Sequence, residues 1–413
     1  MSKKRASLKQ ESLALSGDEA VAYAVKQSSV DVVAAYPITP QTIIVEKFSE
    51  YVNNGEVDTE FVCTESEHSA LTACLTASAT GARTFTASAS AGLALMHEIL
   101  YVTAGSRTPV VMAVVNRALS APINIHCDHS DSMVERDASW VQIYVENSQE
   151  AYDTIIQAFR IAEHTDILLP TMVMLDGFFL SHTLGNICVL PDEAVHAFVG
   201  TRQIPLVTNH EGRAVPFKLD PDNPLTMGPF DLYDYYFEHK RQQEEAMQKA
   251  SHVIKEVHNE YGKLTGRTYG NGLVESYHME DAEIATVCLG STAGTVKTVV
   301  DQLRTKGIKA GLLRLRTYRP LPTQDIREAL ENVKAIAVMD RSHSFGAYGG
   351  PVFHEIRHIL YDSPARQKIV NYIYGLGGRD MPQSLINEIY RELGENLKTG
   401  HVRKTVQFIG LRE

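Results

Sequence analysis

The sequence has few cysteines, and none of them is spaced as metal ligands usually are. Its 413 residues include 5 cysteines, which stand far apart at positions 63, 74, 127, 188 and 288. Without a Cys-x-x-Cys pair, an iron–sulfur cluster or a zinc site within this chain is not expected. A sparse, odd number of thiols without a signal peptide indicates reduced cysteines, so we expect a cytoplasmic protein.

Long basic runs and uninterrupted apolar runs are also missing. The formal net charge is -11, and the longest basic run is the Lys-Lys-Arg tripeptide at residues 3 to 5, which is typical of a chain end. This charge balance argues against a nucleic-acid partner. The most apolar long stretch, residues 84 to 105, is interrupted by His97 and Glu98, so it predicts a buried helix and no membrane insertion.

What is present is an alternation of strand-like and helix-like segments. In the first part of the chain, helical patterns separate the apolar runs DVVAAYP, EFVCT, RTFTAS and TPVVMAVVNR. The same rhythm returns after residue 280, in AEIATVCLGS, IKAGLLRLR and KAIAVMD. Strand-like runs that do not alternate in polarity are typical of parallel sheets with helices on both faces. The predicted fold class is therefore α/β, with two doubly wound parallel-sheet domains.

The segment between these two regions breaks the alternation. It begins with turn signals and continues into a long, polar, amphipathic helical pattern. We therefore predict a first domain at residues 1–200, a connector or arm at 201–280, and a second, smaller domain at 281–413. We expect the arm to pack across a domain boundary or against a partner.

Polar residues follow several strands of the first predicted sheet. Thr39 follows DVVAA between two prolines, Glu65 and Glu67 follow EFVCT, and Arg117 follows PVVMAVVN. In an open parallel sheet, ligands bind beyond the carboxyl ends of the strands. Each residue alone is a weak signal, because most loop residues serve the scaffold.

Glu67 has a specific competing explanation. The sequence TESE fits a capping box, in which Thr64 is the N-cap and Glu67 reaches back to it. On the pattern alone the cap is favoured over catalysis. The following helix is rich in small residues, however, and a glutamate at its buried start could meet a polar ligand atom.

Three further segments carry weaker signals. GSTAGT at 290–295 follows a strand and opens a helix, which suits an anion, but it lacks dinucleotide and P-loop spacing. GLGGRD at 375–380 predicts a tight turn. The acidic and histidine-containing segment 124–137 fits no standard ligand set, so we expect a polar loop at an active site or interface, and no metal site.

Several long motifs resemble one known family. YPITPQT, ESEHSA, TFTASASAGLALMHEILY, VVNRALSAPINIHCDHSDSMVERD and LLRLRTYRPLP, followed by VMDRS, occur in the right order. They resemble the alpha subunit of multi-subunit 2-oxoacid:ferredoxin oxidoreductases, in the pyruvate oxidoreductase (pyruvate synthase) group. The resemblance extends from about residue 15 to 395.

The resemblance implies the fold, the reaction and the partners. It implies a thiamine diphosphate pyrimidine-binding domain followed by a transketolase C-terminal-like domain. The reaction is the oxidative decarboxylation of a 2-oxoacid, pyruvate by default, with coenzyme A, giving acyl-CoA and CO2. Thiamine diphosphate would be shared with a beta subunit, because the diphosphate-binding Gly-Asp-Gly motif is absent from this sequence. Mg²⁺ and 4Fe–4S clusters would belong to the beta, gamma and ferredoxin-like delta subunits, and ferredoxin would accept the electrons.

The resemblance also assigns roles to single residues. Glu67 would hydrogen-bond N1′ of the aminopyrimidine and so activate the cofactor. Thr39 and Arg117 would hold the carboxylate or carbonyl of the 2-oxoacid, which orients the substrate. Pro37 and Ile38 would contact the cofactor. Glu65 is the main rival of Glu67, because it lies two residues away on the same loop.

Several alternatives stay open. The substrate could be an aryl or branched 2-oxoacid, such as phenylglyoxylate giving benzoyl-CoA, with NAD as the final acceptor. The chain could also be a non-catalytic docking subunit, or a self-sufficient transketolase-like enzyme, which the missing diphosphate motif disfavours. The arginines of the second domain could bind coenzyme A phosphates, but ion pairing is the favoured interpretation for Arg314, Arg316 and Arg319.

Overall fold

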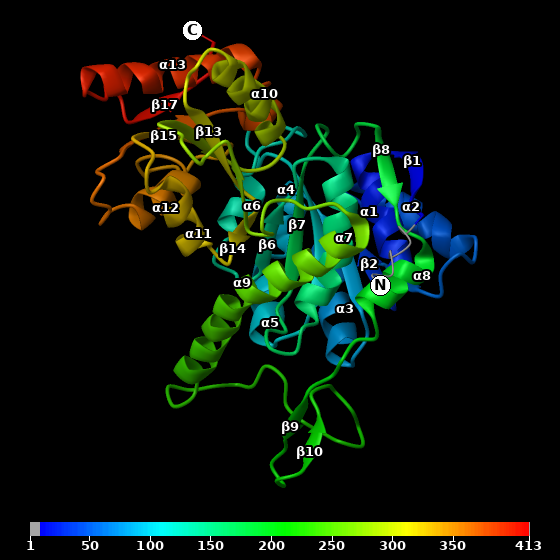
Figure 1. Cartoon of the computed structure of the whole chain (residues 1–413). Helices are drawn as coiled ribbons and strands as arrows, with labels where there is room; N and C mark the ends of the chain where they lie inside the picture. The colour runs from blue at the N-terminus through cyan, green and yellow to red at the C-terminus, as the bar shows by residue number, and fades with distance from the viewer. Residues whose placement is uncertain (1–8, 413) are drawn as a thin grey trace, which may run out of the picture.

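Two large sheets and their covering helices form the chain, in the two-domain α/β architecture that the sequence predicted (Figure 1). The computed structural model describes residues 9–412, so the basic tripeptide at residues 3–5 lies outside the described residues. No helix within this described part is both long and apolar enough to cross a membrane.

The first sheet has the strand order β14-β6-β7-β5-β4-β2-β3, and every neighbouring pair except β14 with β6 is parallel. Its strands are β2 (Val32–Ala35), β3 (Glu60–Cys63), β4 (Thr84–Ser88), β5 (Val110–Asn116), β6 (Val141–Tyr144), β7 (Thr171–Asp176) and β14 (Thr317–Arg319). The central strands β4, β5, β6 and β7 are buried along their whole length, as expected of a sheet covered on both faces.

Helices cover both faces of this sheet. One apolar cluster joins the sheet to the helices α1 (Gly17–Gln27), α2 (Thr42–Asn53), α7 (Ser148–Ala162) and α8 (Asp192–Val199). The same cluster includes residues of a separate two-stranded antiparallel sheet, which is formed by β1 (Glu11–Leu15) and β8 (Gly185–Val189). The opposite face packs against α3 (Glu67–Ala79), α4 (Ser90–Leu95), α5 (His97–Gly105) and α6 (Ser130–Val134). The prediction of one buried helix over residues 84–105 is wrong, because its first five residues form β4 and two short helices follow.

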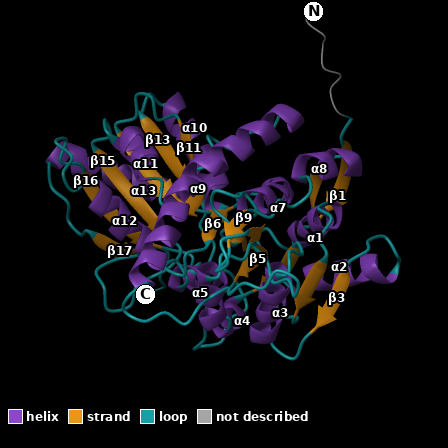
Figure 2. Cartoon of the chain, turned by 90° about the horizontal axis from the view of Figure 1, so that it is seen from below, coloured by secondary structure: helices purple, strands orange, loops and turns teal. Residues whose placement is uncertain are grey.

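The second sheet has the strand order β11-β13-β12-β15-β16-β17. Its strands are β11 (Val274–Tyr277), β12 (Ile284–Cys288), β13 (Ala310–Leu315), β15 (Ala335–Asp340), β16 (Lys368–Ile373) and β17 (Val406–Phe408). The helices α10 (Thr292–Thr305) and α13 (Gln383–Thr399) cover one face. The other face packs against α11 (Thr323–Leu330) and α12 (Pro351–Ile359) (Figure 2). A 3-10 turn, η1 (Leu376–Gly378), follows β16.

Each sheet contains a strand from outside its own stretch of sequence. β11 precedes residue 281 but pairs antiparallel with β13 of the second sheet. β14 lies far along the chain, yet it pairs antiparallel with β6 at the edge of the first sheet. These two strands cross the predicted boundaries, so the division of the chain at residues 1–200, 201–280 and 281–413 stays a prediction.

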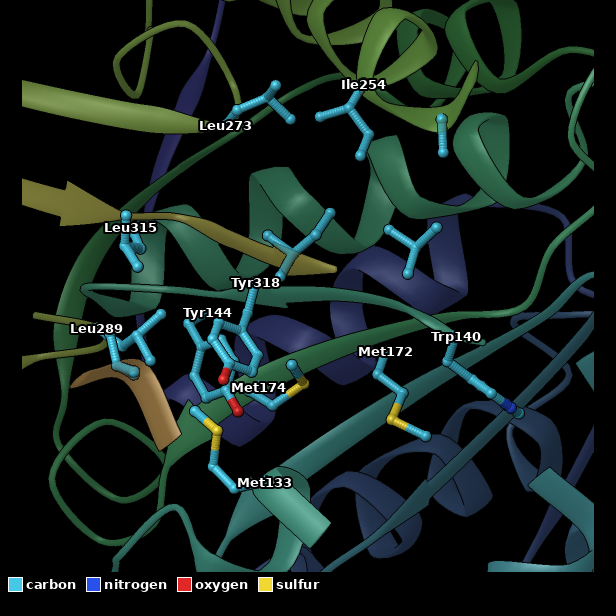
Figure 3. Close-up of a cluster of buried hydrophobic side chains, with 14 of the residues drawn as sticks. Met133, Trp140, Tyr144, Met172, Met174, Ile254, Leu273, Leu289, Leu315 and Tyr318 are labelled. Carbon is cyan, nitrogen blue, oxygen red and sulfur yellow. The ribbon is translucent and has the colours of Figure 1, made fainter. Parts of the chain in front are cut away.

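The connector contains the pair β9 (Leu206–Thr208) and β10 (Ala214–Pro216) and the long helix α9 (Tyr236–Thr265). In Figure 1, β9 and β10 lie at the far end of an arm that leaves the two sheets. The buried face of α9, including Ile254, enters an apolar cluster shared by both sheets, with Met172 from β7 and Leu315 from β13 (Figure 3). The helix therefore packs across the domain boundary, which is one of the two arrangements that the sequence analysis expected for this arm.

Buried ion pairs also join the two domains. The Arg314 guanidinium donates to Glu150 Oε2 at 2.6 Å, and Arg316 donates to Glu150 Oε1 at 2.8 Å. Burial alone would raise the pKa of Glu150, but the two guanidinium groups outweigh it and lower this pKa. Arg319 is paired with Glu355 at 2.7 Å. All three arginines are thus ion-paired, and Arg314 and Arg316 are fully buried, which excludes these two from coenzyme A binding in this conformation.

Replacing Arg314 tests this boundary. We expect Arg314→Met to lower the free energy of unfolding by about 3–5 kcal/mol, because it removes one of the two guanidinium groups that neutralise the buried Glu150 carboxylate. The matched control is Lys334→Met, which removes an exposed pair with Glu283 and should cost less than about 1 kcal/mol. Denaturant unfolding of the purified chain measures both, and equal effects of the two variants would contradict the prediction.

Candidate active site

The predicted site residues gather at one edge of the first sheet. β2, β3, β4 and β5 are parallel neighbours, so their carboxyl ends meet at the same edge. At this edge Thr39 lies in the loop after β2, and Glu67 begins the helix that follows β3. Ser88 is the last residue of β4, and Arg117 directly follows β5. The sheet topology therefore brings together residues that are far apart in the sequence.

The loop that follows β2 is held in place by Gln41. Its side-chain amide donates to the carbonyl oxygens of Tyr36 at 2.9 Å and Ala87 at 3.3 Å. Between these anchors Thr39 is exposed, and its hydroxyl has no hydrogen-bond partner within residues 9–412. Of the two predicted cofactor contacts, Pro37 is exposed and Ile38 is half-buried. The loop thus presents one free hydroxyl on a fixed backbone.

Arg117 contacts this loop directly. Its Nη1 donates to the Thr39 carbonyl at 3.0 Å, and its Nε donates to the Asn124 carbonyl at 3.1 Å. The side chain is 8% exposed. Nη2 has no partner in the described part of the chain, so it can donate to an anionic ligand. The structure therefore brings Thr39 and Arg117 together, as the sequence predicted.

The buried carboxylate of Asp131 organises this region, although the sequence did not single it out. Its Oδ2 accepts from the backbone N–H groups of Ser90 and Arg117, each at 2.9 Å. Its Oδ1 accepts from Asn116 Nδ2 at 2.7 Å and from the Ser132 N–H at 2.8 Å. Burial raises the pKa of Asp131 to about 6. One side chain thus fixes both the start of α4 and the backbone of Arg117.

Glu67 begins α3 and is not part of a capping box. The N-cap is Ser66, whose hydroxyl accepts from the Ser69 N–H at 3.2 Å, so the assignment of Thr64 as the cap is wrong. The Glu67 side chain is 6% exposed and makes no hydrogen bond within the described residues. Its rival Glu65 is exposed and accepts from the Ser69 hydroxyl, which lowers the pKa of Glu65. The structure therefore favours Glu67 over Glu65 as the ligand contact.

The surroundings of Glu67 fit a polar, nitrogen-containing ligand. A Cβ atom placed on Gly92 would lie 2.5 Å from Glu67 Oε1 and 2.6 Å from Ser88 Oγ, so both oxygens converge on the bare backbone of α4. A buried carboxylate without a partner is costly unless a ligand completes its hydrogen bonds. An aminopyrimidine ring nitrogen supplies such a partner, so the residues fit the predicted cofactor.

Another buried carboxylate, that of Asp176 at the end of β7, lies at the domain boundary. It accepts from Arg341 Nη1 at 2.9 Å and from the Ser291 N–H and hydroxyl at 3.1 and 2.5 Å. Burial by itself would raise the pKa of Asp176, but His129 and Arg341 hold it well below its ordinary value. Ser291 belongs to GSTAGT, so the anion at the start of α10 is the chain's own Asp176.

Cys127, His129 and Asp176 place possible metal ligands within 4.8 Å of one another. Burial raises the pKa of the Cys127 thiol, which disfavours the thiolate that binds metals. Asp176 is already neutralised by the Arg341 guanidinium. The cluster is therefore a charge-compensated contact between domains, and its chemistry does not favour a cation.

The segment 124–137 is an interface loop as well as a site loop. Asn124 Nδ2 donates to the Gly377 carbonyl at 3.0 Å, and the Gly378 N–H donates to the Cys127 carbonyl at 2.7 Å. The expected turn GLGGRD is present, and Gly377 and Gly378 both have positive φ. A Cβ on Gly378 would lie 2.3 Å from the Cβ of His126, so glycine is required for this close approach.

Comparisons with known proteins identify the family of this chain. A family model described as pyruvate flavodoxin/ferredoxin oxidoreductase, thiamine diP-bdg, matches residues 23–259, and the model for pyruvate:ferredoxin oxidoreductase core domain II matches residues 282–386. Pyruvate synthase subunit PorA of Thermotoga maritima is 49% identical over 98% of this chain and 99% of its own length. PorA of Methanocaldococcus jannaschii is 49% identical over 91% of this chain and 94% of its own.

More distant matches extend the comparison. Ketoisovalerate oxidoreductase subunit VorA of Pyrococcus abyssi is 42% identical over 96% of this chain and 97% of its own. The solved 2-oxoglutarate:ferredoxin oxidoreductase from Magnetococcus marinus matches with a TM-score of 0.70 at 18% identity, which shows a shared fold. The match covers 93% of this chain and 66% of that one. The chain belongs to the pyruvate flavodoxin/ferredoxin oxidoreductase family, as the alpha-subunit type of a 2-oxoacid:ferredoxin oxidoreductase.

Proposed function

We propose that this chain is the alpha subunit of a thiamine diphosphate-dependent enzyme that oxidatively decarboxylates pyruvate. With coenzyme A the reaction gives acetyl-CoA and CO2, and two electrons leave through iron–sulfur clusters to ferredoxin. The observation that carries this proposal is the buried Glu67 carboxylate without a hydrogen-bond partner in the described residues, at the same sheet edge as Arg117. The PorA relatives at 49% identity support the choice of pyruvate.

Glu67 is the proposed contact to the cofactor. When bound, thiamine diphosphate supplies the carbanion chemistry that breaks the bond between the carbonyl carbon and the carboxylate of a 2-oxoacid. Glu67 holds a proton at the ring nitrogen N1′ and exchanges it during turnover. The Glu67 residue is 6% exposed, and burial of this kind strengthens a hydrogen bond to the ring nitrogen.

Arg117 and Thr39 are the proposed contacts to the substrate. The unused N–H groups of Arg117 can bind the carboxylate, while the bonds to Thr39 and Asn124 keep the guanidinium in one orientation. The exposed Thr39 hydroxyl donates to the same head group. Pro37 and Ile38 form the rest of this stiff loop beside the cofactor. These contacts orient the substrate and balance its charge.

The site needs a second subunit, because this sequence has no Gly-Asp-Gly motif for the diphosphate. We assign the diphosphate and Mg²⁺ to a beta subunit and the 4Fe–4S clusters to partner subunits of the gamma and delta type. The relatives named PorA and VorA are themselves subunits, which supports a hetero-oligomer. A location in the cytoplasm stays a prediction.

A branched 2-oxoacid is the second candidate substrate, since VorA of Pyrococcus abyssi is 42% identical. Activity of the assembled complex decides between the candidates. We expect thiamine- and coenzyme A-dependent reduction of a viologen dye, with a higher kcat/KM for pyruvate than for 2-oxoisovalerate or phenylglyoxylate. Absence of activity with every 2-oxoacid, despite bound cofactor and intact clusters, would favour the docking-subunit alternative.

Glu67→Gln tests the cofactor contact. We expect it to lower kcat at least about 100-fold, because the amide cannot exchange a proton with the ring nitrogen. Glu65→Gln is the matched control two residues away, on an exposed side chain, and should keep wild-type kcat. Steady-state assays of both complexes measure the difference. If Glu67→Gln changes only the melting temperature, the catalytic role is wrong.

Arg117→Ala tests the substrate contact. We expect it to raise the KM for the 2-oxoacid and lower kcat/KM at least about 100-fold, because a charge-assisted pair with the carboxylate is lost. The affinity for thiamine diphosphate should stay unchanged, as calorimetry can show. The exposed Arg391 on α13 provides the control substitution Arg391→Ala. An unchanged KM in the Arg117 variant would contradict the assignment.

A further inference from the structure

The short helix α4 presents a glycine to the candidate catalytic carboxylate. Gly92 is buried within α4, and an added Cβ atom would collide with Glu67 Oε1 at 2.5 Å, with Ser88 Oγ at 2.6 Å and with Glu67 Cγ at 2.8 Å. Contacts below 3.0 Å essentially never occur for a real Cβ atom. The space taken by the Glu67 carboxylate thus exists only because residue 92 has no side chain.

Ser88 adds a hydroxyl to the same space. It is the last residue of β4, is fully buried, and its Oγ has no hydrogen-bond partner within residues 9–412. Since Ser88 Oγ and Glu67 Oε1 both lie within 2.6 Å of one point, they are at most about 5 Å apart. The two oxygens are therefore neighbours that face the same space beside Gly92. Unpaired buried hydroxyls are costly, and in native proteins each needs an explanation.

The surrounding hydrogen bonds fix α4 while leaving Glu67 and Ser88 free. The Ser90 N–H is bound by Asp131, and the Ser90 hydroxyl donates to the Ala118 carbonyl at 2.6 Å. The N–H of Gly92 donates to the Ala89 carbonyl at 2.9 Å. The backbone that faces Glu67 is thus held in place by these hydrogen bonds, which involve neither the Glu67 carboxylate nor the Ser88 hydroxyl.

We propose that Ser88 and Gly92 are positioning residues for Glu67. Gly92 leaves the room that the Glu67 carboxylate occupies. The Ser88 hydroxyl donates a hydrogen bond to Glu67 when the carboxylate is ionised, and accepts a hydrogen bond from Glu67 when the carboxyl group is protonated. The pair keeps one carboxylate oxygen aimed at the ring nitrogen of the aminopyrimidine in both states. This inference rests on the proposed role of Glu67 and assigns the residues that orient it.

Ser88→Ala tests the hydroxyl in the assembled complex. We expect kcat to fall about tenfold or more, which corresponds to a lost hydrogen bond to a charged group, with the KM for pyruvate unchanged. We also expect a weaker circular-dichroism signal from the tautomer of the bound aminopyrimidine ring, recorded without substrate. The matched control is Thr86→Val, which removes another unpaired, buried hydroxyl two residues earlier on the same strand. It should leave kcat and the ring signal unchanged.

Gly92→Ala tests whether the Glu67 carboxylate needs the space beside residue 92. We expect at least about a 100-fold loss in kcat, because the methyl group displaces the carboxylate. Gly394→Ala in α13 is the control, since a Cβ there meets nothing within 4 Å, and it should keep wild-type kcat. Melting temperatures of both variants show whether the fold is intact.

The outcomes separate this inference from the proposed function. If Ser88→Ala keeps the wild-type kcat and the wild-type ring signal, the inference is overturned. It is also overturned if Thr86→Val lowers kcat and the ring signal as much as Ser88→Ala does. Full activity of Gly92→Ala overturns the assignment of Gly92. If the wild-type complex binds thiamine diphosphate but acts on no 2-oxoacid, the proposed function fails, while the ring signal still decides the role of Ser88.

Discussion

Buried carboxylates of the first domain hold the two domains together, because residues of the second domain neutralise their charges. Asp176 at the end of β7 accepts hydrogen bonds from Arg341 and Ser291. Glu150 on α7 accepts hydrogen bonds from Arg314 and Arg316. Such charges are costly to bury unless the opposite charge is supplied in good geometry, so separating the domains would leave them unpaired. The relative placement of the two sheets follows from this constraint.

The same principle acts within the candidate active site. Asp131 receives four hydrogen bonds and fixes the loops that follow β4 and β5, whereas Glu67 nearby receives none from the described residues. A satisfied carboxylate forms the scaffold, and an unsatisfied one is left for a ligand. This contrast separates the structural acid from the proposed ligand contact more clearly than burial does, because both are buried.

Local sequence patterns predicted the architecture, because the apolar runs located the parallel strands. Strand ends pointed only weakly to Thr39, Glu67 and Arg117, and the family resemblance gave these residues their predicted roles, which stay predictions. The prediction of a capping box with Thr64 was wrong because Ser66, two residues later, supplies the hydroxyl that caps the helix. Asp131 and Ser88 were not found, since their roles depend on contacts between loops that are distant in sequence. The three-residue strand β14 was also missed, because its pairing with β6 is set by tertiary packing.

Strand β14 has a consequence for how the chain can be divided. It covers the outer edge of β6, so a fragment that ends before Thr317 would expose the unpaired backbone groups of a buried strand. Open edges of this kind are templates for aggregation. The first sheet is therefore completed only after β11, β12, α10 and β13 of the second domain have been synthesised, and a cut between the two sheets leaves the first sheet with an open edge.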